Sequence, residues 1–308
     1  MISAKEAAAR GSGGQVRYAL CFFGLIRSLQ WTLDSIERHI LAQLQSNATV
    51  RYDVFVHTYR AARLDNPRAG ETGVAHADPI ADVQRLHPTR YLITSQDDLD
   101  MVYPDVHLLS PLEWLYNENT TIQNIFRAQN SLSLSWAVMA NYAAEHHIDY
   151  AGVVILRPDV LYLRDLDIVR QGILPEHTVF VANFGHYGGC NDRFAYGHAS
   201  AMRVYAHRLD TMVGSTALPA KRVNSEQLLV HHLQAHNINV TLVDMLFARI
   251  RSTGQVPRLD MKILRRACTQ HAAGACHAYH HSEEVTKQLA IAVIEKSAEQ
   301  APQVLDEQ

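Results

Sequence analysis

The segment DYAGVVILRPDVLYLRDLD, residues 149–167, places a cation and a carboxylate directly after an apolar run. The run 151–156 is rich in β-branched residues and predicts a buried strand. Pro158 cannot donate to a strand ladder, so regular pairing should loosen there. Asp159 could then hold a divalent cation on a diphosphate, and Arg157 could bind the same diphosphate with forked hydrogen bonds. A structural salt bridge at the strand end is the alternative explanation.

The segment CFFGLIRSL, residues 21–29, is a second candidate for phosphate contact. Gly24 ends an apolar strand and lets the backbone approach a ligand closely. Arg27 follows at a predicted helix start, and such a helix N-terminus suits a nucleotide phosphate. A turn that simply reverses the chain direction explains the presence of Gly24 equally well. The segment is not the GxGxxG dinucleotide fingerprint, and no GxxxxGK[ST] phosphate loop occurs in the sequence.

The segment GGCNDRFAYG, residues 188–197, combines glycines, polar groups and aromatic residues. A sugar offers an apolar ring face and hydroxyl edges, which suit aromatic rings beside carboxamide and carboxylate groups. The polar residues of this segment are Asn191, Asp192 and Arg193, followed by the aromatic Phe194. A structured turn before a capped helix explains the same residues.

The segment NSEQLL, residues 224–229, predicts the start of a helix. Asn224 or Ser225 can be the N-cap, and Glu226 in the first turn is favoured by the helix dipole. Glu226 could also be a general base that deprotonates an acceptor hydroxyl. The segment alone does not separate the structural explanation from the catalytic one.

A cluster of cysteines and histidines occupies residues 268–281, CTQHAAGACHAYHH. It lacks paired C-x₂-C units and matches no standard zinc spacing, so a polar surface helix or loop is predicted. The chain's 4 cysteines are too few and too scattered for a disulfide scaffold. They predict free thiols in a reducing compartment.

Strand-like and helix-like segments alternate along the chain and must position these residues. The predicted strands lie within residues 18–23, 52–57, 90–94, 151–156, 177–184 and 239–254. The predicted helices lie within residues 28–44, 121–147 and 224–238. This alternation predicts a single α/β domain with a Rossmann-like, mainly parallel sheet and helices on both faces. Such sheets bind ligands at the carboxyl ends of their strands.

Composition and charge limit the possible partners. The 308 residues are 47% hydrophobic and 19% charged, with a net charge of −3, so we expect a globular protein without a basic field for nucleic acid. No apolar stretch reaches the roughly 20 residues that span a bilayer. The N-terminus lacks the apolar core of a secretory signal. We therefore expect a soluble, cytoplasmic protein with a flexible leader (1–16), a domain (17–285) and a C-terminal helix with a frayed tail (286–308).

Taken in order, these segments resemble glycosyltransferases of the GT-A, nucleotide-diphospho-sugar transferase fold. The resemblance covers roughly residues 18–254. In the similar glycosyltransferase-like proteins, the strand before the active site ends in Arg-x-Asp, and a later segment reads Asp-Arg-Phe-x-x-Gly. Here these motifs correspond to residues 157–159 and 192–197.

The resemblance implies roles for the candidate residues. Donor-binding residues would be Gly24, Arg27, His57, Thr58, Arg157 and Asp159. Asp159 would hold Mn²⁺ or Mg²⁺ in place of the family's Asp-x-Asp motif. Arg157 replaces the first Asp of that motif, which puts metal dependence in doubt. Glu226 would be the catalytic base, with Asp192 as the alternative. Asn191, Arg193 and Phe194 would bind the acceptor.

The resemblance also implies the reaction. A hexosyl or pentosyl group would move from a UDP- or GDP-linked sugar to a hydroxyl of a glycan or glycoconjugate. A non-catalytic nucleotide- or carbohydrate-binding module that keeps the fold is the main alternative. A dinucleotide-dependent oxidoreductase is weakened by the missing glycine fingerprint, and a zinc protein would depend on the C-terminal histidines.

Overall fold

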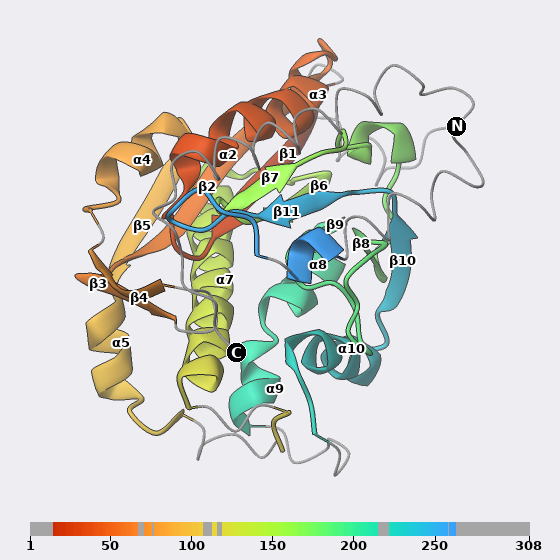
Figure 1. Ribbon diagram of the computed structural model, residues 1–308. Helices are drawn as coiled ribbons and strands as arrows, with labels where there is room; N and C mark the ends of the chain where they lie inside the picture. Colours follow the sequence, from red (N-terminus) through yellow and green to blue (C-terminus); the bar gives the residue numbers. More distant parts are fainter. Residues whose placement is uncertain are drawn as a thin grey trace.

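The computed structural model describes residues 15–66, 71–75, 77–106, 113–115, 119–214, 222–257 and 259–262. Within these residues, the central sheet has seven strands in the order β10-β8-β9-β6-β1-β2-β5 (Figure 1). Their bounds are β1 (Val16–Phe23), β2 (Val50–Arg60), β5 (Arg90–Ser95), β6 (Gly152–Leu156), β8 (Thr178–Ala182), β9 (Ala195–Gly197) and β10 (Asn239–Val243).

The sheet is mainly parallel, as the sequence predicts. Strand β1 pairs in parallel with β2 and β6, β2 with β5, and β8 with β10. Strand β9 is antiparallel to its neighbours β6 and β8. All five residues of β6 are buried, as expected for a central strand that is covered on both faces.

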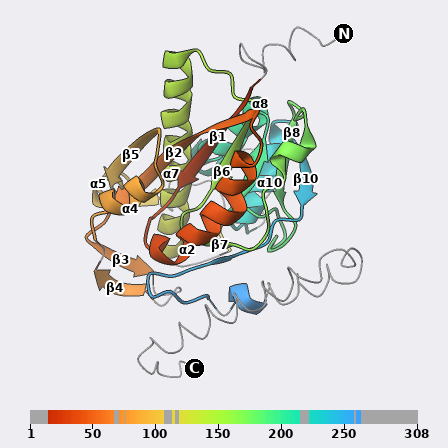
Figure 2. The ribbon, with the colours of Figure 1, turned by 90° about the horizontal axis from the view of Figure 1, so that it is seen from above.

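Helices cover both faces of the sheet. On one face, α2 (Leu29–Ile36) continues through a π-helical turn, η1 (Glu37–Leu41), into α3 (Ala42–Gln45). The other face carries α7 (Asn119–His146), α8 (Ala199–Ala206) and α10 (Ser225–Ala235). Successive side chains of β1 alternate between the two core clusters, with Leu20 in one and Cys21 in the other. Figure 2 shows α2 and α7 on opposite sides of the sheet.

The described residues also form two short two-stranded sheets, both antiparallel. One pairs β3 (Arg63–Asn66) with β4 (Glu71–Ala75), and the other pairs β7 (Val160–Tyr162) with β11 (Phe247–Arg249). The remaining described elements are α4 (Ile80–Arg85), α5 (Gln96–Val102), η3 (Ile168–Gln171) and α9 (Leu209–Gly214).

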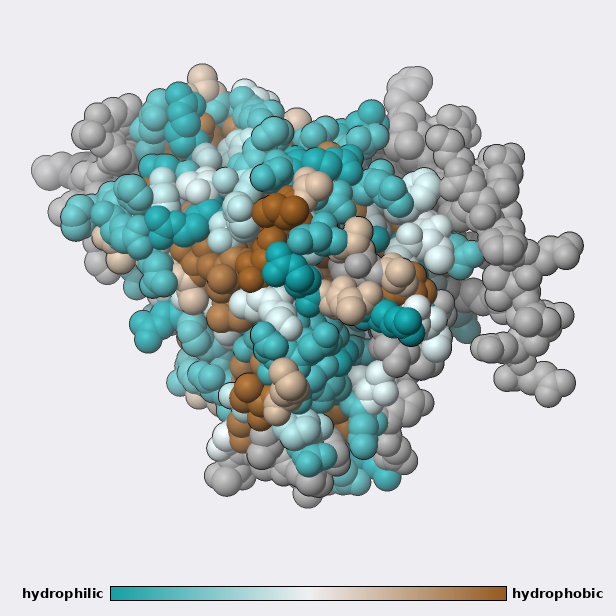
Figure 3. Space-filling model, turned by 90° about the vertical axis from the view of Figure 1, so that its left-hand side faces the viewer, coloured by the Kyte–Doolittle hydropathy of each residue, from teal (hydrophilic) through white to brown (hydrophobic). Residues whose placement is uncertain are grey.

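Strand β5 is one edge of the central sheet. Tyr91 and Leu92 are exposed on it. Figure 3 shows this side of the molecule, where apolar residues gather within a mostly polar surface.

Several predictions on the chain ends lie outside the described residues. These are most of the leader, the C-terminal helix and tail, and the cysteine–histidine cluster at 268–281. Val16, the last residue of the predicted leader, is already the first residue of β1. In the part of the chain that the structure describes, no helix has the length and apolar character needed to cross a membrane.

Candidate functional site

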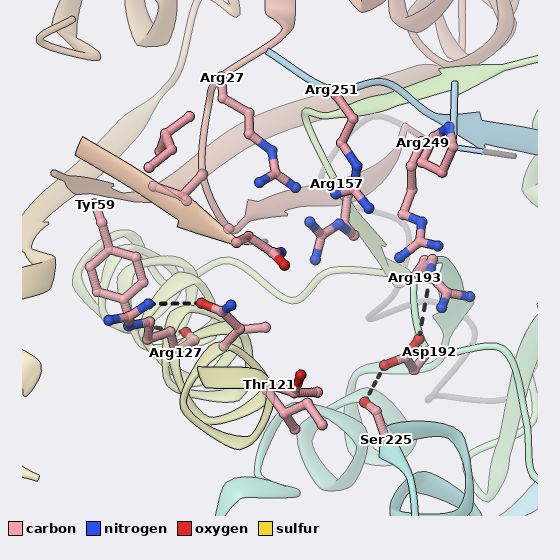
Figure 4. A pocket seen from close by; sticks show the side chains of 18 of the residues that line it. Arg27, Tyr59, Thr121, Arg127, Arg157, Asp192, Arg193, Ser225, Arg249 and Arg251 are labelled. Carbon is pink, nitrogen blue, oxygen red and sulfur yellow. Dashed lines mark hydrogen bonds and ion pairs between the residues drawn. The ribbon is translucent and has the colours of Figure 1, made fainter. Parts of the chain in front are cut away.

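A cavity of about 330 Å³ lies at the carboxyl ends of the parallel strands. Its walls include Gly24 after β1, Tyr59 near the end of β2, and Arg157 after β6. The wall residues also include the arginines Arg27, Arg127, Arg193, Arg249 and Arg251 and the carboxylates Asp192 and Glu226. Figure 4 shows arginine side chains converging on the cavity, with Asp192 and Ser225 at another part of its wall. The arrangement places positive charge at one part of the wall and carboxylates at another.

Asp159 organises the arginines nearest to β1 and β6, although its carboxylate is fully buried. Its Oδ1 accepts a hydrogen bond from Arg157 Nε (2.8 Å), and its Oδ2 accepts from Arg157 Nη2 (2.7 Å) and Arg27 Nη2 (2.9 Å). Burial opposes ionisation of Asp159, but the charges of Arg157 and Arg27 hold its pKa well below the usual range. The carboxylate is therefore an ionised anchor for two guanidinium groups.

The predicted metal role of Asp159 does not fit this arrangement. Both carboxylate oxygens already accept hydrogen bonds from arginine, so a metal ion bound to either oxygen would lie beside positively charged guanidinium groups, which repel it. Among the described residues, no group of three or more His, Cys, Asp or Glu side chains could hold a metal ion. The charge of Asp159 is therefore already balanced by arginine and not by a metal ion.

The opposite part of the wall is built at the start of α10. Asn224 is the N-cap, and it exchanges hydrogen bonds with Gln227 in a capping box. This cap fixes the first turn, where Glu226 is 4% exposed and its Oε1 accepts a hydrogen bond from Arg193 Nη2 (2.8 Å). Burial and then the nearby Asp192 charge raise the pKa of Glu226 to about 7. A carboxyl group with such a pKa can exchange a proton near neutral pH.

Asp192 lies beside Glu226 and is held differently. Its Oδ2 accepts a short hydrogen bond from Ser225 Oγ, and its Oδ1 lies 3.9 Å from Arg193 Nε. Burial opposes ionisation, but the charges of Arg193 and Arg208 outweigh it and lower the pKa of Asp192. The two neighbouring carboxyl groups therefore have pKa values shifted in opposite directions, as acid–base pairs in active sites often do.

Gly189 allows the loop before β9 to pack directly against the start of α10. Cys190 N donates a hydrogen bond to Glu226 O (3.1 Å). A Cβ atom added at Gly189 would lie 2.1 Å from that same oxygen. No L side chain fits there without moving the backbone.

Replacing Gly189 with alanine should lower the free energy of unfolding by about 1–3 kcal/mol, because the added methyl group overlaps backbone rather than a movable side chain. Denaturant unfolding measures the change. Gly214→Ala is the matched control, since a Cβ there meets nothing within 4 Å, and we expect a change of less than about 0.5 kcal/mol. Equal stability of the Gly189→Ala variant and the unmodified protein would contradict this close packing.

The structure brings together six of the predicted site residues at the cavity. These are Gly24, Arg27, Arg157, Asp192, Arg193 and Glu226. The other predicted residues are His57, Thr58, Asp159, Asn191 and Phe194, and all five are fully buried.

His57 and Thr58 lie beneath the turn after β1 and do not line the cavity. His57 Nδ1 lies 2.7 Å from Ser131 Oγ, and Ser131 Oγ also accepts a hydrogen bond from Gly24 N (2.7 Å). Thr58 Oγ1 accepts from Ile26 N (3.2 Å). Burial lowers the pKa of His57 to about 3, so its ring is neutral at pH 7. These residues position the Gly24 turn, and in this structure neither of them lines the cavity.

Asn191 and Phe194 likewise face the interior. Asn191 Nδ2 donates to Phe184 O (2.8 Å), and its Oδ1 accepts from Arg193 N (3.0 Å). Phe194 packs in the core beside Tyr162. Tyr187 is the aromatic residue of this loop that lines the cavity, and Arg193 lies over its ring at 5.9 Å. Composition alone could not separate a core turn from a sugar-binding loop.

The sequence analysis missed Arg249 and Arg251. Arg249 is the last residue of β11, and Arg251 lies two residues further along the chain. A spacing of two puts side chains on the same face of an extended segment, and this was the available signal. Arg249 donates to both oxygens of Asp260 (2.8 and 2.6 Å). Arg251 is 8% exposed and its Nε makes no hydrogen bond.

The fold and the site define an α/β protein with an arginine-rich pocket at the strand ends. Residues 14–256 match the family described as domain of unknown function (DUF7796), and the chain belongs to that family. No curated protein matches the chain.

Solved structures of glycosyltransferases are among those similar to the chain. Mouse xyloside xylosyltransferase 1 is 13% identical with a TM-score of 0.39, and the match covers 74% of this chain and 85% of that one. The glycosyltransferase GlyE of Streptococcus pneumoniae is 12% identical with a TM-score of 0.34, over 74% of this chain and 45% of that one. The chain thus spans less than half of GlyE, and at this similarity function has to be inferred from the pocket itself.

Proposed function

We propose that the protein is a glycosyltransferase that transfers a hexosyl or pentosyl group from a nucleoside-diphosphate sugar to an acceptor hydroxyl. The observation that carries this proposal is the division of the cavity wall. Arg27, Arg157, Arg249 and Arg251 lie at one part of the wall, and Asp192 lies at another. Glu226 also lines the cavity, and it lies beside Arg193 and Asp192. Glycosyl transfer needs both a site for a departing anion and a group that accepts a proton.

The arginine wall supports binding of the leaving group. During transfer, the bond between the anomeric carbon and the diphosphate oxygen breaks, and negative charge collects on the diphosphate. Preorganised guanidinium groups stabilise such developing charge without reorganising. Forked donors also suit phosphate oxygens better than a point charge does. Arg27 and Arg157 are already oriented by Asp159, so they lose little freedom on binding.

The carboxylate side supports activation of the acceptor. As the acceptor oxygen bonds to the anomeric carbon, its proton must pass to a base. Glu226 lines the cavity, and its pKa of about 7 suits this transfer near neutral pH. Asp192 is the alternative base: Ser225 Oγ donates to its Oδ2, whereas its Oδ1 makes no hydrogen bond within the described part of the chain and lies 3.9 Å from Arg193 Nε.

A non-catalytic binding module is the second candidate. The observation that favours it is the hydrogen bond from Arg193 to Glu226, since a carboxylate held by arginine is a weaker base. A bound acceptor would have to replace that hydrogen bond before Glu226 could act.

Release of nucleoside diphosphate from a panel of UDP-, GDP- and CDP-linked sugars, with and without simple glycoside acceptors, tests the proposal. We expect one nucleotide class to raise the melting temperature by mass action and to be hydrolysed or transferred. Binding without turnover of any donor would favour the binding module. NAD(H) is included in the melting-temperature measurement. If NAD(H) raises the melting temperature and no sugar nucleotide does, both candidate functions are wrong.

A further inference from the structure

Arg251 differs from the other arginines around the cavity in making no direct ion pair with a described residue, although the charges of Asp159 and Glu71 act on it from a distance. Its side chain is buried, its Nε makes no hydrogen bond, and no ion pair joins it to any residue that the structure describes. Figure 4 places the side chain between Arg27 and Arg249, near the Arg157 guanidinium. Burial of a charged group without a direct partner is costly, so Arg251 is suited to bind an anion.

The carboxylates nearest to Arg251 already form ion pairs with the neighbouring arginines. Arg27 pairs with Glu71 (2.7 Å) and Asp159 (2.9 Å), and Arg157 pairs with Asp159 (2.7 Å). Arg249 pairs with Asp260 (2.6 Å). Burial first, and then the charges of Arg27 and Arg249, lower the pKa of Arg251 to about 10, so it still carries its proton at pH 7. This part of the wall therefore holds a surplus positive charge.

Backbone contacts fix the segment that presents Arg251. Arg251 N donates to Gln255 O (2.9 Å), and Gly254 N donates to Arg251 O (2.8 Å). Glu71 Oε1 accepts from Ser252 N (3.0 Å), while its Oε2 accepts from Arg27 Nη1 (2.7 Å). Glu71 thus ties the Arg251 segment to Arg27. The guanidinium is presented by a folded turn, which reduces the entropy lost when a ligand binds.

A divalent cation at the same place is disfavoured by the residues present. Asp159 would be its carboxylate ligand, but Asp159 already accepts three hydrogen bonds from the positively charged Arg27 and Arg157. A cation there would also face the guanidinium groups of Arg249 and Arg251, whose charges act on Asp159 and on one another. Like charges in a poorly solvated site repel strongly.

We propose that Arg251, with Arg27, Arg157 and Arg249, binds the diphosphate of the donor directly and takes the place of a divalent cation. This inference rests on the proposed function for the identity of the ligand. The guanidinium groups neutralise the diphosphate by charge-assisted hydrogen bonds. Arg251 supplies a charge that forms no ion pair with a carboxylate among the described residues.

Calorimetric titration of inorganic pyrophosphate into the full chain tests this site without any sugar transfer. In EDTA, we expect saturable binding, and replacing EDTA with Mg²⁺ should tighten it by less than about threefold. Arg251→Gln should weaken binding by about 10- to 100-fold, the usual effect of one hydrogen bond to a charged group. Arg203→Gln removes an exposed arginine away from the cavity and should change binding by less than twofold.

The outcomes separate this inference from the proposed function. Binding that requires a divalent cation, or an Arg251→Gln variant that binds as the unmodified protein does, would overturn the inference and leave the transferase proposal standing. If pyrophosphate binds in EDTA but no sugar nucleotide is turned over, the inference stands and the transferase proposal is wrong. If Arg251→Gln does not fold, Arg251→Lys replaces it, and we expect weaker binding because lysine lacks the forked donors. The titration of the unmodified protein in EDTA tests the inference even if neither variant folds.

Discussion

Replacing Asp159 with asparagine should lower the free energy of unfolding by about 3–5 kcal/mol, the usual cost of removing one partner from a buried ion pair. Asp159 is fully buried and accepts hydrogen bonds from both Arg157 and Arg27. Asparagine removes the negative charge and turns one acceptor into a donor that faces a guanidinium group. Arg157 would then be a buried cation without its counter-charge.

Denaturant unfolding of the Asp159→Asn variant measures this loss, and Asp165→Asn is the matched control. Asp165 also forms an ion pair, with His39 at 2.7 Å, but its side chain is 56% exposed. Exposed pairs contribute at most about 1 kcal/mol, so the control should remain close to the unmodified protein. Equal unfolding free energies for the two variants would show that Asp159 is not the buried anchor described above.

The pH dependence of stability should report the same carboxylate. The arginines depress the pKa of Asp159 in the folded state, whereas an unfolded chain has an aspartate pKa of about 3.9. The stabilisation is therefore fully present above that unfolded value and is lost as the pH falls toward the lower folded value. The Asp159→Asn substitution also changes the surroundings of Arg157. A loss of activity in this variant would therefore not show that Asp159 is a metal ligand.

The sequence could predict which strand ends meet, because parallel strands bring their carboxyl ends to one edge of the sheet. For that reason Arg27 and Arg157 were found from the strand ends, although they lie far apart in the chain. Glu226 was found from a different signal, the pattern of a helix start. The strand-end rule failed for His57, because its ring lies further from the end of β2, where Ser131 and Thr94 cover it. Tyr59, two residues further along β2, is the one that lines the cavity.

The charge balance of the site could not be predicted from local sequence. Glu71 and Asp260 carry no motif, yet they pair with Arg27 and Arg249 and so leave Arg251 without a carboxylate partner among the described residues. These pairings join segments separated by up to 44 residues. The sequence shows which arginines exist, but the fold decides which of them a ligand can use.

Replacing Glu226 with glutamine should reduce kcat/KM for transfer by about 10²- to 10⁴-fold if Glu226 is the base of the proposed reaction. The substitution nearly preserves shape, and the amide oxygen can still accept the hydrogen bond from Arg193 Nη2. We therefore expect a small change in melting temperature. Pyrophosphate affinity should stay within about threefold, because Glu226 is not one of the guanidinium groups assigned to the diphosphate.

The pH profile separates a catalytic role from a structural one. A general base acts in its ionised form, so kcat/KM of the unmodified protein should rise with pH through about 7, the pKa of Glu226. The Glu226→Gln variant should lose this rise as well as the rate. Asp192→Asn is the informative comparison, because the lowered pKa of Asp192 places its ionisation well below that range. If Asp192→Asn abolishes transfer while Glu226→Gln keeps both the rate and the rise near pH 7, Asp192 is the base. In that case Asp192 accepts the proton from the acceptor hydroxyl. Glu226, whose pKa is about 7, then has a structural role: it holds the start of α10 against Arg193.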